Sequence, residues 1–156
     1  MKAASINELK KELEEKTNTD LITYCLRLSR FKKENKELLT FLLFEASEIS
    51  AYIENVNNET RALFNEINTG HIYYIKKGIR KILRNVNKHI RFSGSKQVEA
   101  ELLIQFCNGF IAFPASALRN KQFAKMYEIQ LEKIAKALST LHPDLQYDLN
   151  KQLNKK

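Results

Sequence analysis

Glycine and proline, the two residues that most often interrupt helices, are scarce in this sequence. Four glycines and two prolines among 156 residues fall well below the roughly 12% of an average protein. Few tight turns are therefore expected, and the chain is predicted to form long helices joined by short connections. No apolar/polar alternation with a period of two runs for more than a few residues, so β-strands are not expected.

Long apolar runs and paired cysteines are also missing. No uninterrupted apolar stretch approaches the ~20 residues that a membrane-spanning helix needs, and no secretory signal pattern opens the chain. The cytoplasm is therefore the expected location. The two cysteines, Cys25 and Cys107, lie in apolar patterns without the spacing of a metal site or a redox pair. We expect both to be buried, reduced thiols.

The residue patterns that carry common enzyme chemistry are absent as well. None of the three histidines, His71, His89 and His142, has a carboxylate or another histidine three or four residues further on, so helical metal-binding patterns are not formed. There is no Gly-rich phosphate loop and no Gly-x-Ser-x-Gly motif. A Cys–His nucleophile pair that meets only in space stays open, but apolar surroundings raise a thiol pKa and disfavour it. We expect no catalytic residue, no metal and no cofactor.

Apolar residues recur at helical spacing along most of the chain, with capping signals between the runs. Ser5-Ile6-Asn7-Glu8 forms a capping box, Gly70 suits a left-handed helix end, and Pro143 suits a first helical turn. Asn68-Thr69-Gly70 and Phe92-Ser93-Gly94-Ser95 are expected to separate helices, and Pro114 to end one near Phe113. The expected helices cover residues 6 to about 16, 17 or 19 to 29, 34–46, 48–68, 71–91, 95–113, 116–141 and 143–153.

The predicted fold is therefore all-α. We expect a single domain over 1–156 with seven to eight mostly antiparallel helices and a frayed tail at about 152–156. An irregular α-α superhelix and a closed helical bundle fit the pattern equally. In Leu38–Phe44, six of seven residues are large and apolar, and a helix that is apolar on nearly every side usually lies at the centre of a packed array. This segment is the predicted central helix.

The net charge of the chain is concentrated in one segment. No acidic residue lies between Glu66 and Glu99, and the remaining 18 basic residues equal the 18 acids in number, so the formal charge of +8 comes from this interval. Such a segment should project a positive field toward an anionic partner. Its eight cations are Lys76, Lys77, Arg80, Lys81, Arg84, Lys88, Arg91 and Lys96.

On a helical wheel the segment 71–91 divides into two faces. Ile72, Ile75, Ile79, Ile82, Leu83, Val86 and Ile90 share one arc, and most of the cations share another arc centred about 140–150° away. Only Lys76 lies near the apolar edge. The apolar arc should therefore face the core and leave the cations in solvent, at the cost of repulsion between like charges four residues apart.

Three interpretations of the basic helix follow. The cations form a solvated face, partly neutralised by acids of the preceding segment such as Glu59; or they bind nucleic-acid phosphates without base specificity; or they bind an acidic partner protein, the chain then acting as a scaffold or adaptor. An anionic membrane surface is less suitable, because the apolar arc is rich in isoleucine rather than in residues typical of lipid contact.

The functional prediction is a non-catalytic interaction module. Its predicted anion-binding residues are Lys76, Lys77, Arg80, Lys81, Arg84, Lys88 and Arg91, and nucleic acid is slightly favoured over acidic protein. The predicted accessory residues are Tyr73 and His89, which could stack on bases or contact phosphate, and Arg27 and Arg30, which would widen the basic patch if they folded beside it. Nothing in the sequence indicates a homo-oligomer.

Overall fold

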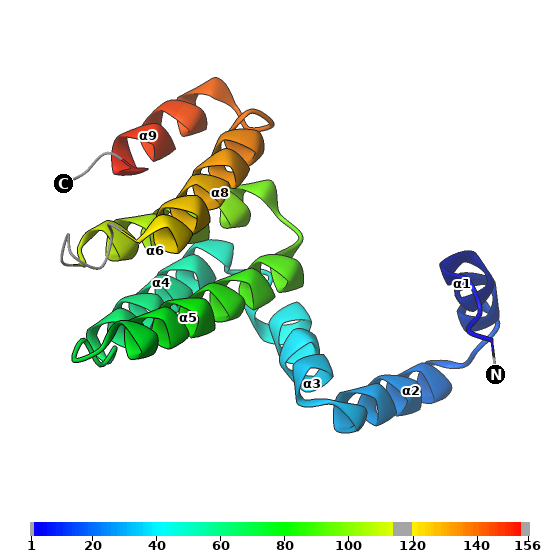
Figure 1. The fold of residues 1–156 in the computed structure, drawn as a ribbon. Helices are drawn as coiled ribbons and strands as arrows, with labels where there is room; N and C mark the ends of the chain where they lie inside the picture. The colour runs from blue at the N-terminus through cyan, green and yellow to red at the C-terminus, as the bar shows by residue number, and fades with distance from the viewer. Residues whose placement is uncertain (1, 114–119, 154–156) are drawn as a thin grey trace. The chain divides into compact units, whose positions relative to one another are not determined.

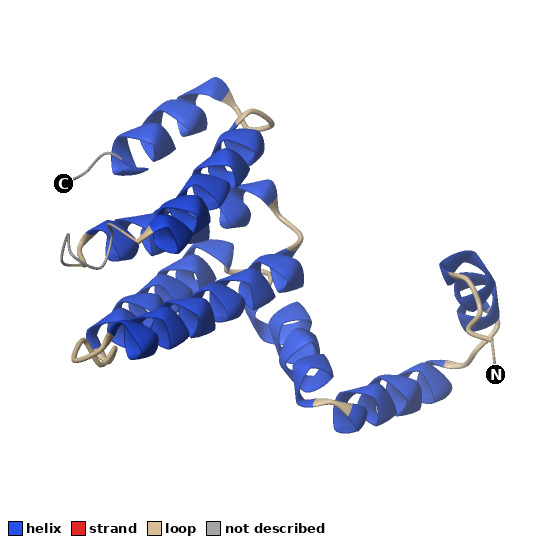
Figure 2. Ribbon diagram, in the orientation of Figure 1, coloured by secondary structure: helices blue, strands red, loops and turns tan. Residues whose placement is uncertain are grey.

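The computed structural model describes residues 2–113 and 120–153. Throughout these residues the regular structure is helical and contains no strand (Figures 1 and 2), which confirms the all-α prediction. The helical elements are α1 (Ile6–Glu14), α2 (Asn18–Phe31), α3 (Lys33–Thr40), the π-helical turn η1 (Phe41–Glu45), α4 (Ile49–Asn65), α5 (Ile72–Ser93), α6 (Lys96–Ile111), α8 (Lys121–Leu138) and α9 (Pro143–Leu153).

Contacts along the chain group into two compact units. The N-terminal unit is Met1–Phe44 and the C-terminal unit is Glu45–Lys156, and each is described by itself. The prediction of a single domain over 1–156 stays a prediction.

The N-terminal unit begins with two helices that are capped in the same way. The Ser5 hydroxyl accepts from the Glu8 amide, while the Glu8 carboxylate accepts from the Ser5 amide at 2.7 Å, which is the predicted capping box. Thr17 and Asp20 repeat the arrangement at the start of α2. These reciprocal bonds satisfy amide groups that a helix start leaves without partners. Between residues 2 and 40, however, no side chain is buried.

The segment predicted to be the central helix does not occupy that place. Phe41 is buried, but Leu42, Leu43 and Phe44 are 57%, 65% and 71% exposed. The prediction was wrong because an apolar sequence shows only that a helix could be covered on every side, whereas its burial depends on whether neighbouring helices reach it.

In the C-terminal unit the central helix is α6. It packs against α4, α5, α8 and α9, and Figure 1 shows α4 and α5 side by side. Its buried residues cover about two thirds of the helix circumference, as expected for a helix with neighbours on several sides. Phe106 and Phe110 pack against rings from flanking helices, with centroids 5.7 Å from Phe64 and 5.8 Å from Phe123. The buried residues of α6 are Val98, Ala100, Leu102, Leu103, Ile104, Phe106, Cys107 and Phe110.

Two glycines let helices approach closely, as expected for glycines inside helices. A Cβ on Gly109 would lie 2.6 Å from the ring carbons of Phe64, and one on Gly78 would lie 2.8 Å from Cγ1 of Ile67. Real Cβ atoms do not come this close. The absence of a side chain at Gly109 therefore lets α4 lie against α6, and its absence at Gly78 lets Ile67, in the connection after α4, lie against α5.

Several predicted helix ends need correction. Among the described residues the left-handed glycine is Gly94, with φ of 61°, and not Gly70, because Asn68 Oδ1 accepts the Gly70 amide in a local turn instead. α6 ends at Ile111, two residues before the expected boundary. The expected cap Ser116 lies outside the described residues, and α8 begins at Lys121 with Asn120 as its cap. The tail expected to fray is still helical at Gln152 and Leu153, and the rest of it lies outside the described residues.

Candidate nucleic-acid interface

The basic helix α5 is anchored by one apolar face. Its Ile75, Ile79, Ile82 and Val86 are at most 6% exposed, as the helical wheel predicts. At its start His71 Nδ1 accepts the Tyr73 amide at 3.1 Å, and at its end Gly94 forms a left-handed cap. Because this face is held in the core, the side chains on the opposite face must point outward.

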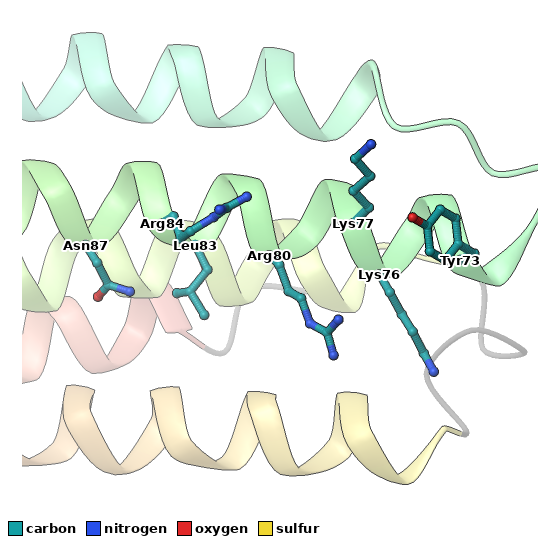
Figure 3. Close-up of a pocket in the computed structure, with 7 residues that line it drawn as sticks. All are labelled: Tyr73, Lys76, Lys77, Arg80, Leu83, Arg84 and Asn87. Atoms are coloured by element: carbon teal, nitrogen blue, oxygen red, sulfur yellow. The ribbon is translucent and has the colours of Figure 1, made fainter. Parts of the chain in front are cut away.

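A groove runs along one side of α5, beside its apolar face. It has a volume of about 540 Å³ and is lined by Tyr73, Lys76, Lys77, Arg80, Leu83, Arg84 and Asn87 (Figure 3). All of these residues come from α5, so the helical repeat alone spaces them. Four of the seven carry a positive charge, and like charges along one groove reinforce one another's potential.

The cations leave α5 on more than one side. Figure 3 shows Lys76 and Arg80 extending toward α8, and Lys77 extending toward α4. The Lys76 ammonium lies 6.0 Å from the centre of the Phe123 ring on α8, a cation–π distance. Lys77 also lines a second groove of about 230 Å³ between α4 and α5, together with Lys81 and Glu66.

Within the described part of the chain, no carboxylate lies within ion-pair distance of the first five cations of α5. Glu66 shares a groove with Lys77 and Lys81 without pairing with them. Glu59 is one of the acids expected to neutralise part of the basic face. Its carboxylate accepts a hydrogen bond from Asn85 Nδ2 at 3.1 Å, and its Oε2 lies 4.0 Å from Nε2 of His89. We call these five residues the α5 cationic face: Lys76, Lys77, Arg80, Lys81 and Arg84.

The remaining two predicted anion-binding residues, Lys88 and Arg91, are not part of this set. Lys88 resembles Lys76 in its surroundings: both are half-buried, and the Lys88 ammonium lies 5.9 Å from the centre of the Phe92 ring. Arg91 is exposed in the last turn of α5. Both make a further interaction within the chain, so neither is counted in the α5 cationic face.

The four accessory residues are found in three different settings. Tyr73 is 60% exposed and lines the groove. The ring of His89 is largely buried, and its Nδ1 lies 2.7 Å from the Tyr52 hydroxyl. His89 therefore links α4 and α5 instead of facing an open surface. Arg27 and Arg30 are exposed on α2, in the N-terminal unit.

The sequence did not single out two of the groove residues or the Tyr52–His89 pair. Leu83 is half-buried at the edge of the apolar arc, and Asn87 follows it by four residues. Their spacing from Lys76 and Arg80 places all four along one side of the helix, so the signal was present in the helical wheel. In the Tyr52–His89 pair, burial together with Glu45 and Glu59 raises the pKa of Tyr52 to about 12.

The two cysteines behave differently. Cys107 is buried as predicted, and burial raises its pKa to about 12. Cys25 is exposed, which corrects the prediction for that residue. It belongs to α2, a helix without buried residues, so an apolar sequence neighbourhood did not bring burial.

Over 2–113 and 120–153, His, Cys, Asp and Glu form no cluster that could hold a metal ion. No described helix is both long enough and apolar enough to cross a bilayer. In the comparisons with known proteins, no family model, no curated protein and no solved structure matches this chain.

Proposed function

We propose that this protein binds the phosphate backbone of nucleic acid, without base specificity, through the α5 cationic face. The observation that carries the proposal is the groove on α5, which gathers Lys76, Lys77, Arg80 and Arg84. These cations have no carboxylate partner among the described residues. Unpaired cations on a rigid helix exchange only water and counterions when an anion arrives, so binding does not first require an internal ion pair to break.

The length of the cationic face suits a phosphate chain. From Lys76 to Arg84 the helix axis rises about 12 Å, which spans about three phosphates along one strand of a duplex. A single small anion would engage only part of this length. A polymer with regularly spaced charges can engage all of it.

The composition of the groove favours a contact that does not depend on sequence. The polar groups of its described lining are ammonium and guanidinium groups, one phenol and the amide of Asn87. This described lining contains no carboxylate and a single amide, whereas base recognition uses several such groups together. Tyr73 offers an exposed ring on which a base can stack, as in single-strand binding. Unpaired nucleotides are therefore the preferred ligand.

The test is the salt dependence of binding to a fluorescent single-stranded oligonucleotide, with a duplex of the same sequence alongside. On a duplex we expect log K to fall linearly with log salt with a slope of about −3 to −4, corresponding to about 0.9 per neutralised phosphate. A triple variant, Lys77→Gln, Arg80→Gln and Arg84→Gln, should reduce the slope by about one for each residue. Its circular dichroism spectrum should not change, since all three are exposed.

The matched control removes the same charge elsewhere in the C-terminal unit. Lys125, Lys133 and Lys136 are exposed on α8, which also carries Glu128 and Glu132. Changing these three lysines to glutamine lowers the net charge equally but should leave most of the slope. An equal reduction of the salt slope in both triple variants would show that binding responds only to net charge, which would contradict the proposal.

An acidic protein partner is the other outcome that the test recognises. In that case oligonucleotide binding is not measurable, and one protein co-purifies with the chain after nuclease treatment. The triple variant of α5 no longer binds this protein. A cytoplasmic location, where nucleic acid and such partners are both present, belongs to the same proposal.

A further inference from the structure

The N-terminal unit leaves most of its apolar surface exposed, although α2 packs against α3. Between residues 2 and 44 the single buried side chain is Phe41. The exposed fractions of the large apolar residues range from 41% to 80%, and they belong to Ile6, Leu9, Leu13, Ile22, Tyr24, Leu26, Leu28, Phe31, Leu42, Leu43 and Phe44. Single exposed apolar residues are ordinary, but a concentration of this size marks an interaction surface.

The helices of this unit are too short to be stable without cover. α1 has nine residues, α2 has 14 and α3 has eight, whereas isolated helices shorter than about 12–15 residues are marginal in water. Their capping boxes contribute only about 1 kcal/mol each. α2 also carries exposed apolar residues over more than half of its circumference, including Ile22, Tyr24 and Leu28, which is wide for a helix with no buried side chain.

An apolar pocket between α1 and α2 shows what kind of group fits this surface. It has a volume of about 500 Å³ and is lined by Ile6, Leu9, Leu13 and Leu21, with Lys10 and Glu14 at its edge. No group of polar side chains converges on it, so it is suited to apolar side chains and not to a polar small molecule.

Charge within the same unit is divided between its two ends. Residues 8–20 contain five acids and three lysines, whereas residues 27–37 contain five cations and two acids. Asp20 lies in the first turn of α2 and Arg30 in its last. If two copies of this unit pack antiparallel about a two-fold axis, the acidic α1 end of each meets the basic end of the other, at the end of α2 and the start of α3. A two-fold interface requires this self-complementarity.

We infer that residues 2–44 form a dimerisation unit whose partner is a second copy of this chain. A two-fold interface of ordinary size buries about 800 Å² on each side, and eleven large apolar residues of this unit are exposed and available to contribute to it. The same partner would place apolar side chains in the pocket and pair opposite charges with the two charged segments. The inference does not depend on α5 or on the proposed nucleic-acid binding.

The first experiment measures the mass of the full chain by sedimentation equilibrium over a wide range of concentration. A reversible dimer is expected. The double variant Leu26→Glu and Phe31→Glu should raise the dimer Kd by about 100-fold, because it removes two central apolar contacts and buries charge in their place. Both side chains are exposed within one copy, so the monomer should keep its circular dichroism spectrum. Ile129→Glu, at an exposed apolar residue of α8, is the control and should leave the Kd unchanged.

The second experiment uses the separated charges. One variant carries Glu12→Lys and Glu15→Lys, and the other carries Arg27→Glu and Arg30→Glu; all four residues are exposed. Each variant alone should dimerise at least ten-fold more weakly, since like charges now meet at both ends of the interface. Mixed together they should form a heterodimer, which native mass spectrometry distinguishes by mass.

Three results would overturn the inference. A wild-type chain that stays monomeric over the whole concentration range means that the same chain, a different protein or a lipid surface covers the apolar residues. A dimer whose Kd is unchanged in all three double variants of the N-terminal unit but rises in Ile129→Glu places the interface in the C-terminal unit. A dimer whose charge variants show no preference for each other when mixed excludes the antiparallel arrangement.

Discussion

The two compact units of this chain reach helical structure by different means. Both capping boxes found in the described residues belong to the N-terminal unit, at Ser5 and Thr17, yet no side chain in α1, α2 or α3 is buried. In the C-terminal unit, α4 starts without a side-chain cap and still buries five residues. Local hydrogen bonds therefore define where α1 and α2 begin, whereas tertiary burial stabilises the C-terminal helices.

The largest expected effect compares two phenylalanines, one from each unit. Phe106 is fully buried against Phe64 and Phe110, so Phe106→Ala should lower the free energy of unfolding by about 3–5 kcal/mol. Phe31 is 76% exposed, and Phe31→Ala should change it by less than about 0.5 kcal/mol. Urea unfolding at low protein concentration, where the monomer predominates, measures both. Similar losses would remove the distinction between the two units.

A second effect tests the close contact between α4 and α6. In an exposed helix Gly→Ala is stabilising by about 0.5–1 kcal/mol. At Gly109 the new Cβ would lie 2.6 Å from the Phe64 ring, and the resulting displacement should destabilise the protein by about 1–3 kcal/mol. The sign of the change in melting temperature therefore shows whether α4 and α6 are in close contact at Gly109. A rise in melting temperature for Gly109→Ala would show that α4 and α6 have room between them.

A smaller effect compares matching caps in the two units. Ser5 caps α1 and Ser95 caps α6, and replacing either with alanine should cost about 1 kcal/mol. For Ser95→Ala this cost should appear in the global unfolding free energy. For Ser5→Ala it should appear as faster amide exchange confined to α1, because no buried residue couples α1 to the rest. Hydrogen exchange measured residue by residue separates the two, and uniform acceleration in Ser5→Ala would contradict the expectation.

The last effect is a loss of stability at alkaline pH that arises in the C-terminal unit. Burial raises the pKa of Cys107 and of Tyr52 to about 12, so the folded state keeps two protons that the unfolded chain releases at lower pH. Stability should therefore be complete below about pH 9 and decline as the pH rises toward 12. Cys107→Ala and Tyr52→Phe should each flatten this decline. An unchanged pH profile in both variants would mean that other groups cause it.

The helices themselves were largely predictable from the sequence. Ser5-Ile6-Asn7-Glu8 specifies its capping box through local chemistry, and the isoleucines of α5 specify their buried face through the helical repeat alone. Neither feature depends on distant residues. The left-handed helix end, in contrast, was predicted at Gly70 and lies at Gly94. Both glycines follow a helix, so local chemistry does not distinguish them.

The central helix and the details of the candidate interface were less accessible. Leu38–Phe44 and α6 are both rich in apolar residues, and the difference between them is which neighbours reach them. The helical wheel predicted that the cations face solvent. It could not predict that His89 pairs with the hydroxyl of Tyr52, which lies 37 residues earlier in the sequence. Long-range pairings of this kind leave no periodic trace in the sequence.

The contrast between the two thiols has a practical consequence for spectroscopy. Cys107 is enclosed in α6 with a pKa of about 12, while Cys25 is exposed on α2. A maleimide spin label or fluorophore at neutral pH should attach to Cys25 alone, without any engineered cysteine. The chain therefore carries one natural probe position in its N-terminal unit, from which distances to a second labelled molecule are directly measurable.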